Sequence, residues 1–401
     1  MRAMDTAIPE VLHARLVDGL VSGGHVRAPA VETAMRTVPR HLFLPQTPVE
    51  DAYADRIVVT KRFADGTSLS SASQPSVVAA MLEQAAVQPG ERVLEIGAGT
   101  GYNAALLREL VGDGGRVATI DIDPDVTREA HENLTAAGYD DVHVATGDGA
   151  DGVPTDAPYD LIIVTSGAWD IPAGWWAQLA EHGRIVVPLR WRGLTRSLAL
   201  DYHGGIIPQL TSRSMLLCGF ISMRGDSDGE RIIDIADDVA LHVDQDLPLD
   251  ADTLRGVLDR PRTESWADAI IGGDVPFDGI WLRLSIADPG TCRIKAQRSA
   301  VDAERATPAI PGLSPAVAEG DSLAYLASRR AEDGTGWQMG AIGHGPRGAE
   351  LAGRLVRQID LWHEDRAAQP SVALFPAGTP DDQRTGDVVI NKRDSRMTFT
   401  W

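Results

Sequence analysis

Regular alternation between residues 92 and 189 constrains the fold more than any other feature of this chain. Short apolar segments with strand character are separated by segments whose apolar residues recur at helical spacing. Strands are predicted at 92–96, 116–122, 141–146, 159–166 and 183–189, with helices at 103–110 and 124–137. Strands that alternate with helices are typical of a parallel, doubly wound sheet. The first half of the chain is therefore predicted to be an α/β domain.

A boundary is predicted where this alternation stops, in the polar, glycine-bearing stretch RGDSDGE near Gly225. The 401 residues are enough for two domains. We expect a catalytic domain over 1–222 and a smaller α/β or α+β accessory domain over 223–401. Within the second, strands are predicted at 279–286, 322–328 and 371–377, a helix at 349–364, and a loop or linker at 306–317.

Charge excludes several classes of partner. The chain has 57 acidic and 37 basic residues, a formal net charge of −20, whereas nucleic-acid binders carry a basic footprint. The same balance disfavours an anionic membrane surface, and no run of about 18 apolar residues predicts a membrane span. The first residues lack the apolar core of a signal peptide. We therefore expect a cytoplasmic protein with no nucleic-acid or membrane partner; the sequence leaves its oligomeric state open.

The segment VLEIGAGTGYNAALL, residues 93–107, carries the chemistry. A predicted strand ends in an acid and is followed by glycines at 97, 99 and 101, then by a predicted helix. The dinucleotide fingerprint needs its third glycine three residues after the second, and Tyr102 stands there instead. Glycines at this spacing let a backbone approach a ligand closely. The motif resembles that of class I S-adenosylmethionine-dependent methyltransferases, with a Rossmann-like fold.

Further acids follow the next two predicted strands. Asp121 ends the second, where that class holds the ribose hydroxyls, and Asp148 follows the third, beside the adenine. The resemblance implies a site for S-adenosylmethionine, with S-adenosylhomocysteine as product, formed by Glu95, Gly97, Ala98, Gly99, Gly101, Asn103, Asp121, Ile122, Asp148, Gly149 and Thr165. The alternative is purely structural: a buried strand-end carboxylate at Glu95, a solvated turn at Asp121 and Asp123, and a helix cap at Asp148.

A narrower resemblance covers about residues 10–200. The segments VPRHLFLP (38–45), DAYADR (51–56), SSASQPSVVAAML (70–82) and YDLIIVTSGAWDIP (159–172) are similar to the protein-L-isoaspartate O-methyltransferase family. There, the Ser of the Ser-Gln-Pro element lies beside the carboxyl group that is methylated. The resemblance implies that Ser73 is catalytic and that Ser71, Ser73 and Gln74 bind substrate. An N-cap before Pro75 is the structural reading of Ser73, and both readings are compatible.

Two departures from the family indicate the substrate. Ser71-Ala72 replaces a Thr-Ile pair, and about 175 residues follow the catalytic half. Both features, and the ending VVINKRDSRMTFTW, resemble a branch associated with ribosomally made, modified peptides (lanthipeptides, lasso peptides and graspetides). The resemblance implies esterification of an Asp side chain in a macrocyclic or otherwise premodified peptide, leading to a succinimide (aspartimide), an isoaspartate or both. Repair of isoaspartate in damaged proteins is the alternative. A methyltransferase fold that serves only for binding is a third hypothesis.

No general base is needed for this reaction, because a carboxylate with a reference pKa near about 4 is ionised at neutral pH. The sequence also lacks H-E-x-x-H and G-x-S-x-G patterns, and two cysteines, Cys218 and Cys292, are too few for a structural zinc site. We therefore expect no metal and no hydrolase chemistry.

Overall fold

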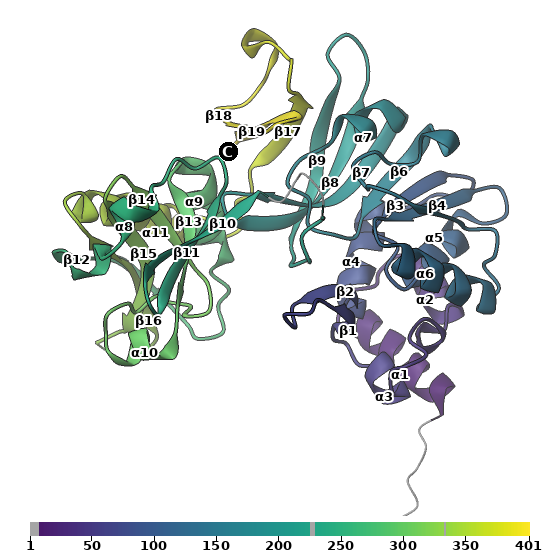
Figure 1. Ribbon diagram of the computed structural model, residues 1–401, viewed down its shortest axis with the longest axis horizontal. Helices are drawn as coiled ribbons and strands as arrows, with labels where there is room; N and C mark the ends of the chain where they lie inside the picture. The colour runs from purple at the N-terminus through teal and green to yellow at the C-terminus, as the bar shows by residue number, and fades with distance from the viewer. Residues whose placement is uncertain (1–7, 225–228, 333) are drawn as a thin grey trace, which may run out of the picture. The chain divides into compact units, whose positions relative to one another are not determined.

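The computed structural model describes residues 8–224, 229–332 and 334–401. The chain divides into two compact units (Figure 1). Unit 1 comprises residues 1–189, 195–228 and 372–398, and unit 2 comprises 190–194, 229–371 and 399–401. The last strands of the chain therefore belong to the first unit, which corrects the expected division into 1–222 and 223–401. Residues 225–228, within the predicted boundary, lie outside the described part.

Helices and a short hairpin begin unit 1: α1 (Pro9–Ser22), α2 (Pro29–Thr37), the 3-10 turn η1 (Arg40–Phe43), α3 (Val49–Ala52), β1 (Val58–Arg62), β2 (Ser68–Ala72) and α4 (Pro75–Ala85). Proline begins α1, α2 and α4, at the position where its missing N–H costs nothing. Leu16, Leu20 and Met35 are buried in a core shared with α4 and α5. The hairpin β1–β2 is antiparallel and forms a sheet of its own.

The alternating part of unit 1 comprises β3 (Arg92–Ile96), α5 (Tyr102–Val111), β4 (Arg116–Asp121), α6 (Pro124–Ala136), β5 (His143–Thr146), η2 (Pro154–Asp156), β6 (Tyr159–Val164), α7 (Ala173–Gln178), β7 (Leu179–Trp191), β8 (Leu194–His203) and β9 (Gln209–Leu217). Strands β7, β6, β3, β4 and β5 are parallel neighbours in that order. The apolar strands β3 and β6 are almost wholly buried, as expected in a sheet covered on both faces. The predicted doubly wound α/β fold is confirmed.

C-terminal strands extend this sheet. β17 (Ser371–Pro376), the turn η4 (Asp381–Gln383), β18 (Val388–Asn391) and β19 (Ser395–Thr400) follow unit 2 in the chain. β17 pairs antiparallel with β9, and the order β18-β19-β17-β9-β8 completes a ten-stranded sheet. The yellow strands beside β9 in Figure 1 show this return. The buried Asp170 carboxylate accepts hydrogen bonds from the Asp394 amide (2.6 Å) and the Ser395 hydroxyl (2.5 Å), so the C-terminal motif is attached to the loop after β6.

Unit 2 contains a seven-stranded antiparallel sheet in the order β10-β11-β13-β14-β15-β16-β12. Its elements are β10 (Glu230–Ala236), β11 (Val239–Asp244), α8 (Ala251–Leu254), η3 (Val257–Asp259), β12 (Arg262–Ile271), α9 (Asp278–Ala287), β13 (Thr291–Ala296), α10 (Arg298–Asp302), β14 (Ser314–Glu319), β15 (Ser322–Arg330), β16 (Trp337–His344) and α11 (Gly348–Glu364). Leu351, Leu355 and Ile359 of α11 pack with Ile280 and Leu284 of α9.

Two local predictions for unit 2 were wrong. Residues 279–286 form most of helix α9 instead of a strand, because a short apolar run is compatible with either a strand or a buried helix. The apolar residues at every second position of this run are all buried in the helix, and their alternation resembles that of a strand: Ile280, Leu282, Leu284 and Ile286. The predicted loop 306–317 ends inside strand β14. No helix in the described residues is long and apolar enough to cross a membrane.

Candidate active site

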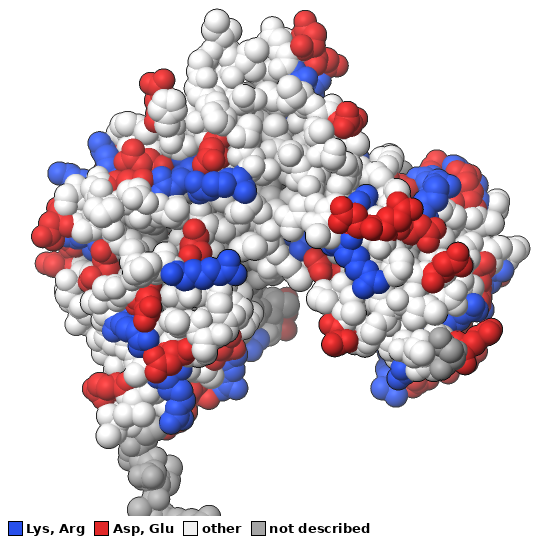
Figure 2. Space-filling model, turned by 180° about the vertical axis from the view of Figure 1, so that it is seen from behind, with Lys and Arg blue, Asp and Glu red and all other residues white. Residues whose placement is uncertain are grey.

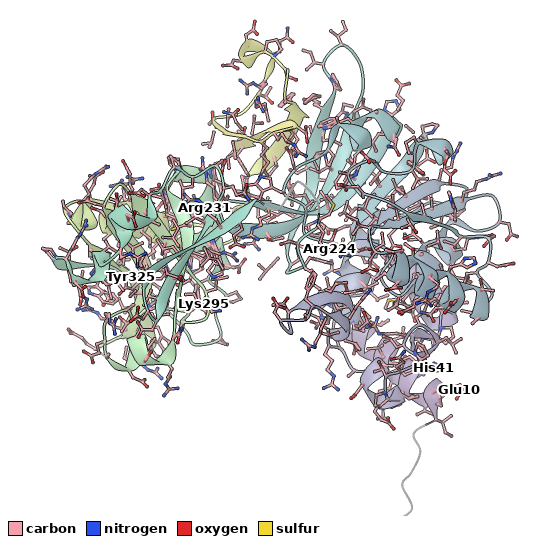
Figure 3. All side chains as sticks on the ribbon, viewed as in Figure 1. Glu10, His41, Arg224, Arg231, Lys295 and Tyr325 are labelled. Carbon is pink, nitrogen blue, oxygen red and sulfur yellow. The ribbon has the colours of Figure 1, made fainter. Side chains whose placement is uncertain are left out.

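A cavity of about 870 Å³ in unit 1 brings the two sequence motifs together. One part of the lining, the glycine-loop wall, consists of residues 95–100, 102 and 103 with Asp121 and Ile122. The opposite serine wall is formed by β2 and the residues that follow it, 68–74. A third part of the lining, residues 219–224, comes after β9, and Figure 3 labels Arg224 at its end.

Glu95 lies at the base of the glycine-loop wall and is 1% exposed. Its carboxylate accepts hydrogen bonds from the Thr119 hydroxyl (2.6 Å) and from the Asn103 amide nitrogen (2.8 Å). Burial raises the pKa of the Glu95 carboxyl to about 7, against the opposing effect of these two hydrogen bonds. Thr119 had no signal in the sequence, because only the parallel pairing of β3 with β4 places it beside Glu95.

Two glycines of the motif exclude a side chain for different structural reasons. A Cβ on Gly97, where φ is +102°, would lie 2.6 Å from the Thr165 hydroxyl oxygen. That hydroxyl donates to the Gly97 carbonyl at 2.7 Å, so Thr165, directly after the neighbouring strand β6, holds the loop in place. Gly101, with φ +87°, is the N-cap of α5, and a Cβ there would meet Leu134 of α6 at 3.0 Å. Gly101 is absent from the cavity lining, so its role is close packing.

Asp121 reaches the cavity from the end of β4. Its carboxylate accepts a hydrogen bond from the Asp123 amide (3.1 Å) and a long one from the Gly99 amide (3.5 Å). Arg224 lies 3.7 Å from the same carboxylate. Asp123 instead caps α6 and bonds Lys61 at 3.0 Å. Ile122, 38% exposed, presents an apolar side chain beside Asp121 on the cavity wall.

Most of the predicted cofactor residues line this cavity: Glu95, Gly97, Ala98, Gly99, Asn103, Asp121, Ile122, Gly149 and Thr165. Asp148 does not. Its carboxylate accepts a hydrogen bond from the Ala150 amide (2.9 Å) within a turn, and no helix begins there for it to cap. Gly149 packs against Ile96, and its carbonyl accepts from the Trp175 indole at 2.8 Å.

Ser71, Ser73 and Gln74 line the serine wall. Ser73 is half-buried, and its hydroxyl makes no hydrogen bond to any residue that the structure describes. It does not cap α4, which corrects the structural reading of Ser73. Asp55 of the segment DAYADR accepts instead from the Ser76 amide (2.9 Å) and from the Gln74 amide nitrogen (3.1 Å). The Ser73 hydroxyl is therefore available to a ligand.

The sequence reasoning missed two features of the lining. Arg40, in the segment VPRHLFLP, is almost fully buried beside Ser73. Residues 219–224 are joined to the loop after β6, since the Gly167 amide donates to Ile221 and the Met223 amide to Gly167, both at 2.8 Å. The expected domain boundary after residue 222 would have cut through this segment. No short motif marks it, because strand pairing alone places it there.

Comparisons with known proteins identify the family of the chain. The family model "Protein-L-isoaspartate(D-aspartate) O-methyltransferase (PCMT)" matches residues 11–202. The protein-L-isoaspartate O-methyltransferase of Methanopyrus kandleri is 43% identical over 176 residues, 44% of this chain and 75% of that protein. The enzyme of the same name from Methanoregula boonei is 43% identical over 190 residues, 47% of this chain and 83% of its own.

Among solved structures, a protein-L-isoaspartate O-methyltransferase has a TM-score of 0.49 and 22% identity, covering 90% of this chain and 96% of its own. The sequence relatives carry the assignment, since each is over 40% identical and is mostly covered by this chain. The predicted cofactor, S-adenosylmethionine, is confirmed at the level of the family, and the chain belongs to the protein-L-isoaspartate O-methyltransferase family.

Proposed function

We propose that this protein esterifies an aspartate-derived carboxylate in a polypeptide substrate. The observation that carries the proposal is the unpaired Ser73 hydroxyl, which shares one cavity with the glycine loop and Asp121. The cavity suits the cofactor: Asp121 offers an acceptor for hydroxyls, Ile122 an apolar surface, and the loop 97–99 close access to backbone. When bound, S-adenosylmethionine supplies a methyl group on a sulfonium, which is open to in-line displacement by an oxygen nucleophile.

The chain's own residues have a positioning task. A substrate carboxylate with an ordinary pKa is already the nucleophile at neutral pH, so no residue needs to remove a proton. The protein must hold one carboxylate oxygen within about 3–3.5 Å of the methyl carbon. It must also offer donors to the other oxygen, because a carboxylate taken out of water without partners is strongly destabilised. Ser73 is such a donor, with Ser71 and Gln74 beside it on the serine wall.

The proposed substrate is an Asp side chain in a constrained, ribosomally made peptide. Three features support this choice: the serine-rich segment 70–73, the second unit at 229–371, and the C-terminal motif that packs on Asp170. The methyl ester is an activated acyl group. The following backbone nitrogen attacks it, methanol leaves, and a succinimide forms; water can open that ring to aspartate or isoaspartate.

Repair of isoaspartyl residues is the second candidate. It is favoured by the relatives, which carry the name protein-L-isoaspartate O-methyltransferase and match most of their length to this chain. The methylation step would be the same, and only the presented carboxylate would differ. Unit 2 has no assigned role under this alternative.

Mass spectrometry distinguishes the two candidates. Three peptides are incubated with the full chain and S-adenosylmethionine: a side-chain-crosslinked macrocycle with one free Asp, its linear counterpart, and a linear isoaspartyl peptide. Gain of one methyl group, or loss of one water, on the macrocycle alone supports tailoring. Methylation of the isoaspartyl peptide supports repair and overturns tailoring.

The Ser73→Ala variant and omission of the cofactor are the matched controls. A protein that binds S-adenosylhomocysteine but methylates none of the three peptides contradicts the proposed substrate class. Failure to bind S-adenosylhomocysteine at all would instead support the hypothesis of a binding-only fold.

A further inference from the structure

Arg40 is a buried cation beside the serine wall. It begins the turn η1, immediately before His41, which Figure 3 labels, and it is 1% exposed. Its guanidinium donates to the Ala52 carbonyl from Nε (3.0 Å) and to the Ser73 carbonyl from Nη2 (2.9 Å). The ring centroid of Tyr102 lies 5.0 Å from its Cζ. Arg40 therefore connects the N-terminal helices to the residue proposed to contact substrate.

Arg40 forms no ion pair with any carboxylate in the described residues, and the nearby Asp55 acts on its charge only from a longer distance. Its Nη1 is buried without a hydrogen-bond partner there, and none of the described carboxylates lies within 4.0 Å of the guanidinium. Both carboxylate oxygens of the nearby Asp55 accept hydrogen bonds elsewhere, from the Gln74 side chain and from the Ser76 backbone amide. Burial lowers the pKa of Arg40 from its usual value, against the opposing effect of the nearby Asp55 carboxylate, so the buried charge is only partly compensated.

A second buried arginine of unit 1 shows what complete pairing looks like. Arg184 donates from Nη1 and Nη2 to the two carboxylate oxygens of Glu91, at 2.7 and 2.6 Å, and from Nε to the Ala85 carbonyl. An interior ion normally has such a partner, because desolvation of an unpaired charge costs more than the fold regains. Arg40 departs from this pattern at the edge of the cavity that receives the substrate.

We propose that the substrate carboxylate is the missing counter-ion of Arg40, which acts as a positioning residue. With 1% exposure, the guanidinium acts through the low-dielectric wall and through the Ser73 backbone that it holds, rather than by direct contact. The inference rests on the proposed function. It adds a consequence: the wall favours the anionic substrate over the neutral methyl ester, so methylation itself promotes release of the product.

A probe independent of the peptide tests this. Acetate and acetamide have nearly the same shape and differ in charge, and both are titrated into the S-adenosylhomocysteine-loaded full chain, with binding followed by NMR at constant ionic strength. The wild-type protein should bind acetate about tenfold more tightly than acetamide. Arg40→Met should reduce that preference to about twofold or less, with unchanged affinity for acetamide and for S-adenosylhomocysteine.

Two further variants separate charge from scaffolding. Arg40→Lys retains the positive charge, so it should keep most of the acetate preference. A lysine cannot hold both carbonyls as the planar guanidinium does, so this variant loses the scaffolding contact. Arg36→Met removes an exposed arginine of α2 and should leave the preference unchanged. If Arg40 only braces the loop, Lys and Met variants will lose cofactor affinity and melting temperature together, and the ratio of acetate to acetamide binding will not change.

Each result has a definite meaning. No acetate preference in the wild-type protein, or a preference that survives in folded Arg40→Met, overturns the inference. If Arg40→Met fails to fold, the wild-type and Arg40→Lys titrations decide. Methylated peptide without an acetate preference contradicts the role of Arg40 alone. An Arg40-dependent acetate preference without methylation of any peptide contradicts the proposed function alone.

Discussion

The two walls of the cavity differ in how fully the protein satisfies its own polar groups. On the glycine-loop wall, the Glu95 carboxylate and the Thr165 hydroxyl have partners in neighbouring segments. On the serine wall, the hydroxyls of Ser70, Ser71 and Ser73 make no hydrogen bond to any described residue, and Arg40, which donates to the Ser73 carbonyl, forms no ion pair with a described carboxylate. A wall whose polar groups are hydrogen-bonded within the protein is preorganised, whereas a wall with free donors can form hydrogen bonds to a ligand.

Charge on the rest of the surface does not mark the site. Figure 2 shows acidic and basic side chains interspersed over the face in view. The overall excess of acids, with a net charge of −20, therefore describes the chain's average and not the polarity of its cavity. Recognition of an anion here depends on a few local donors.

The largest expected effect is on the free energy of unfolding, and it tests the glycine-loop wall through Glu95. Its folded pKa of about 7 exceeds its ordinary value of 4.5, so the carboxyl ionises first in the unfolded chain and stability falls as pH rises between these values. Unfolding in urea should show a loss on the order of 3 kcal/mol across that window. Glu95→Gln should flatten this decline, and the exposed control Glu129→Gln should leave it. An unchanged slope in Glu95→Gln would contradict the assignment.

Asp121 tests whether the same wall holds the cofactor. Asp121→Ala should weaken binding of S-adenosylhomocysteine by roughly 1–3 kcal/mol, because the ribose hydroxyls lose their acceptor. Isothermal titration calorimetry measures the effect. Asp125→Ala, an exposed carboxylate in the first turn of α6, is the matched control. Equal losses in both variants would mean that only the local charge matters.

Ser73 tests the opposite wall. Ser73→Ala should lower kcat/KM by about tenfold, or about 1.4 kcal/mol, because one hydrogen bond to a charged group is lost. Binding of S-adenosylhomocysteine should remain unchanged, since the cofactor is assigned to the other wall. Ser70→Ala, on the strand β2 that precedes Ser73, is the graded control and should cost less. Parallel losses of cofactor affinity and turnover in Ser73→Ala would remove the distinction between the walls.

Asp55 gives the smallest expected effect, on stability alone. Asp55→Ala should reduce the free energy of unfolding by about 1 kcal/mol, because the Ser76 amide at the start of α4 loses its acceptor. Asp55→Asn retains an acceptor oxygen and should recover most of the loss. Chemical denaturation measures both. A strong loss of cofactor affinity in Asp55→Ala would instead extend the influence of the serine wall to the glycine loop.

The sequence predicted unit 1 better than unit 2 for a physical reason. Buried parallel strands are continuous apolar runs that alternate with helices, and this pattern located β3, β4, β6 and their intervening helices to within a few residues. Helix α9 carries a similar apolar run, but it is buried on most sides and lacks the polar stripe of an amphipathic helix. Length and hydrophobicity alone could not separate it from a strand.

The sequence by itself determined the motifs, because each depends on residues adjacent in the chain: the glycine loop, the acids at the carboxyl ends of β3 and β4, and the Ser-Gln-Pro element. Tertiary structure decided everything that depends on pairing between distant segments. It placed Thr119 beside Glu95, the wall 219–224 beside Gly167, Arg40 beneath Ser73, and the C-terminal strands beside β9. Such contacts arise from strand order and burial, which the local pattern of residues does not encode.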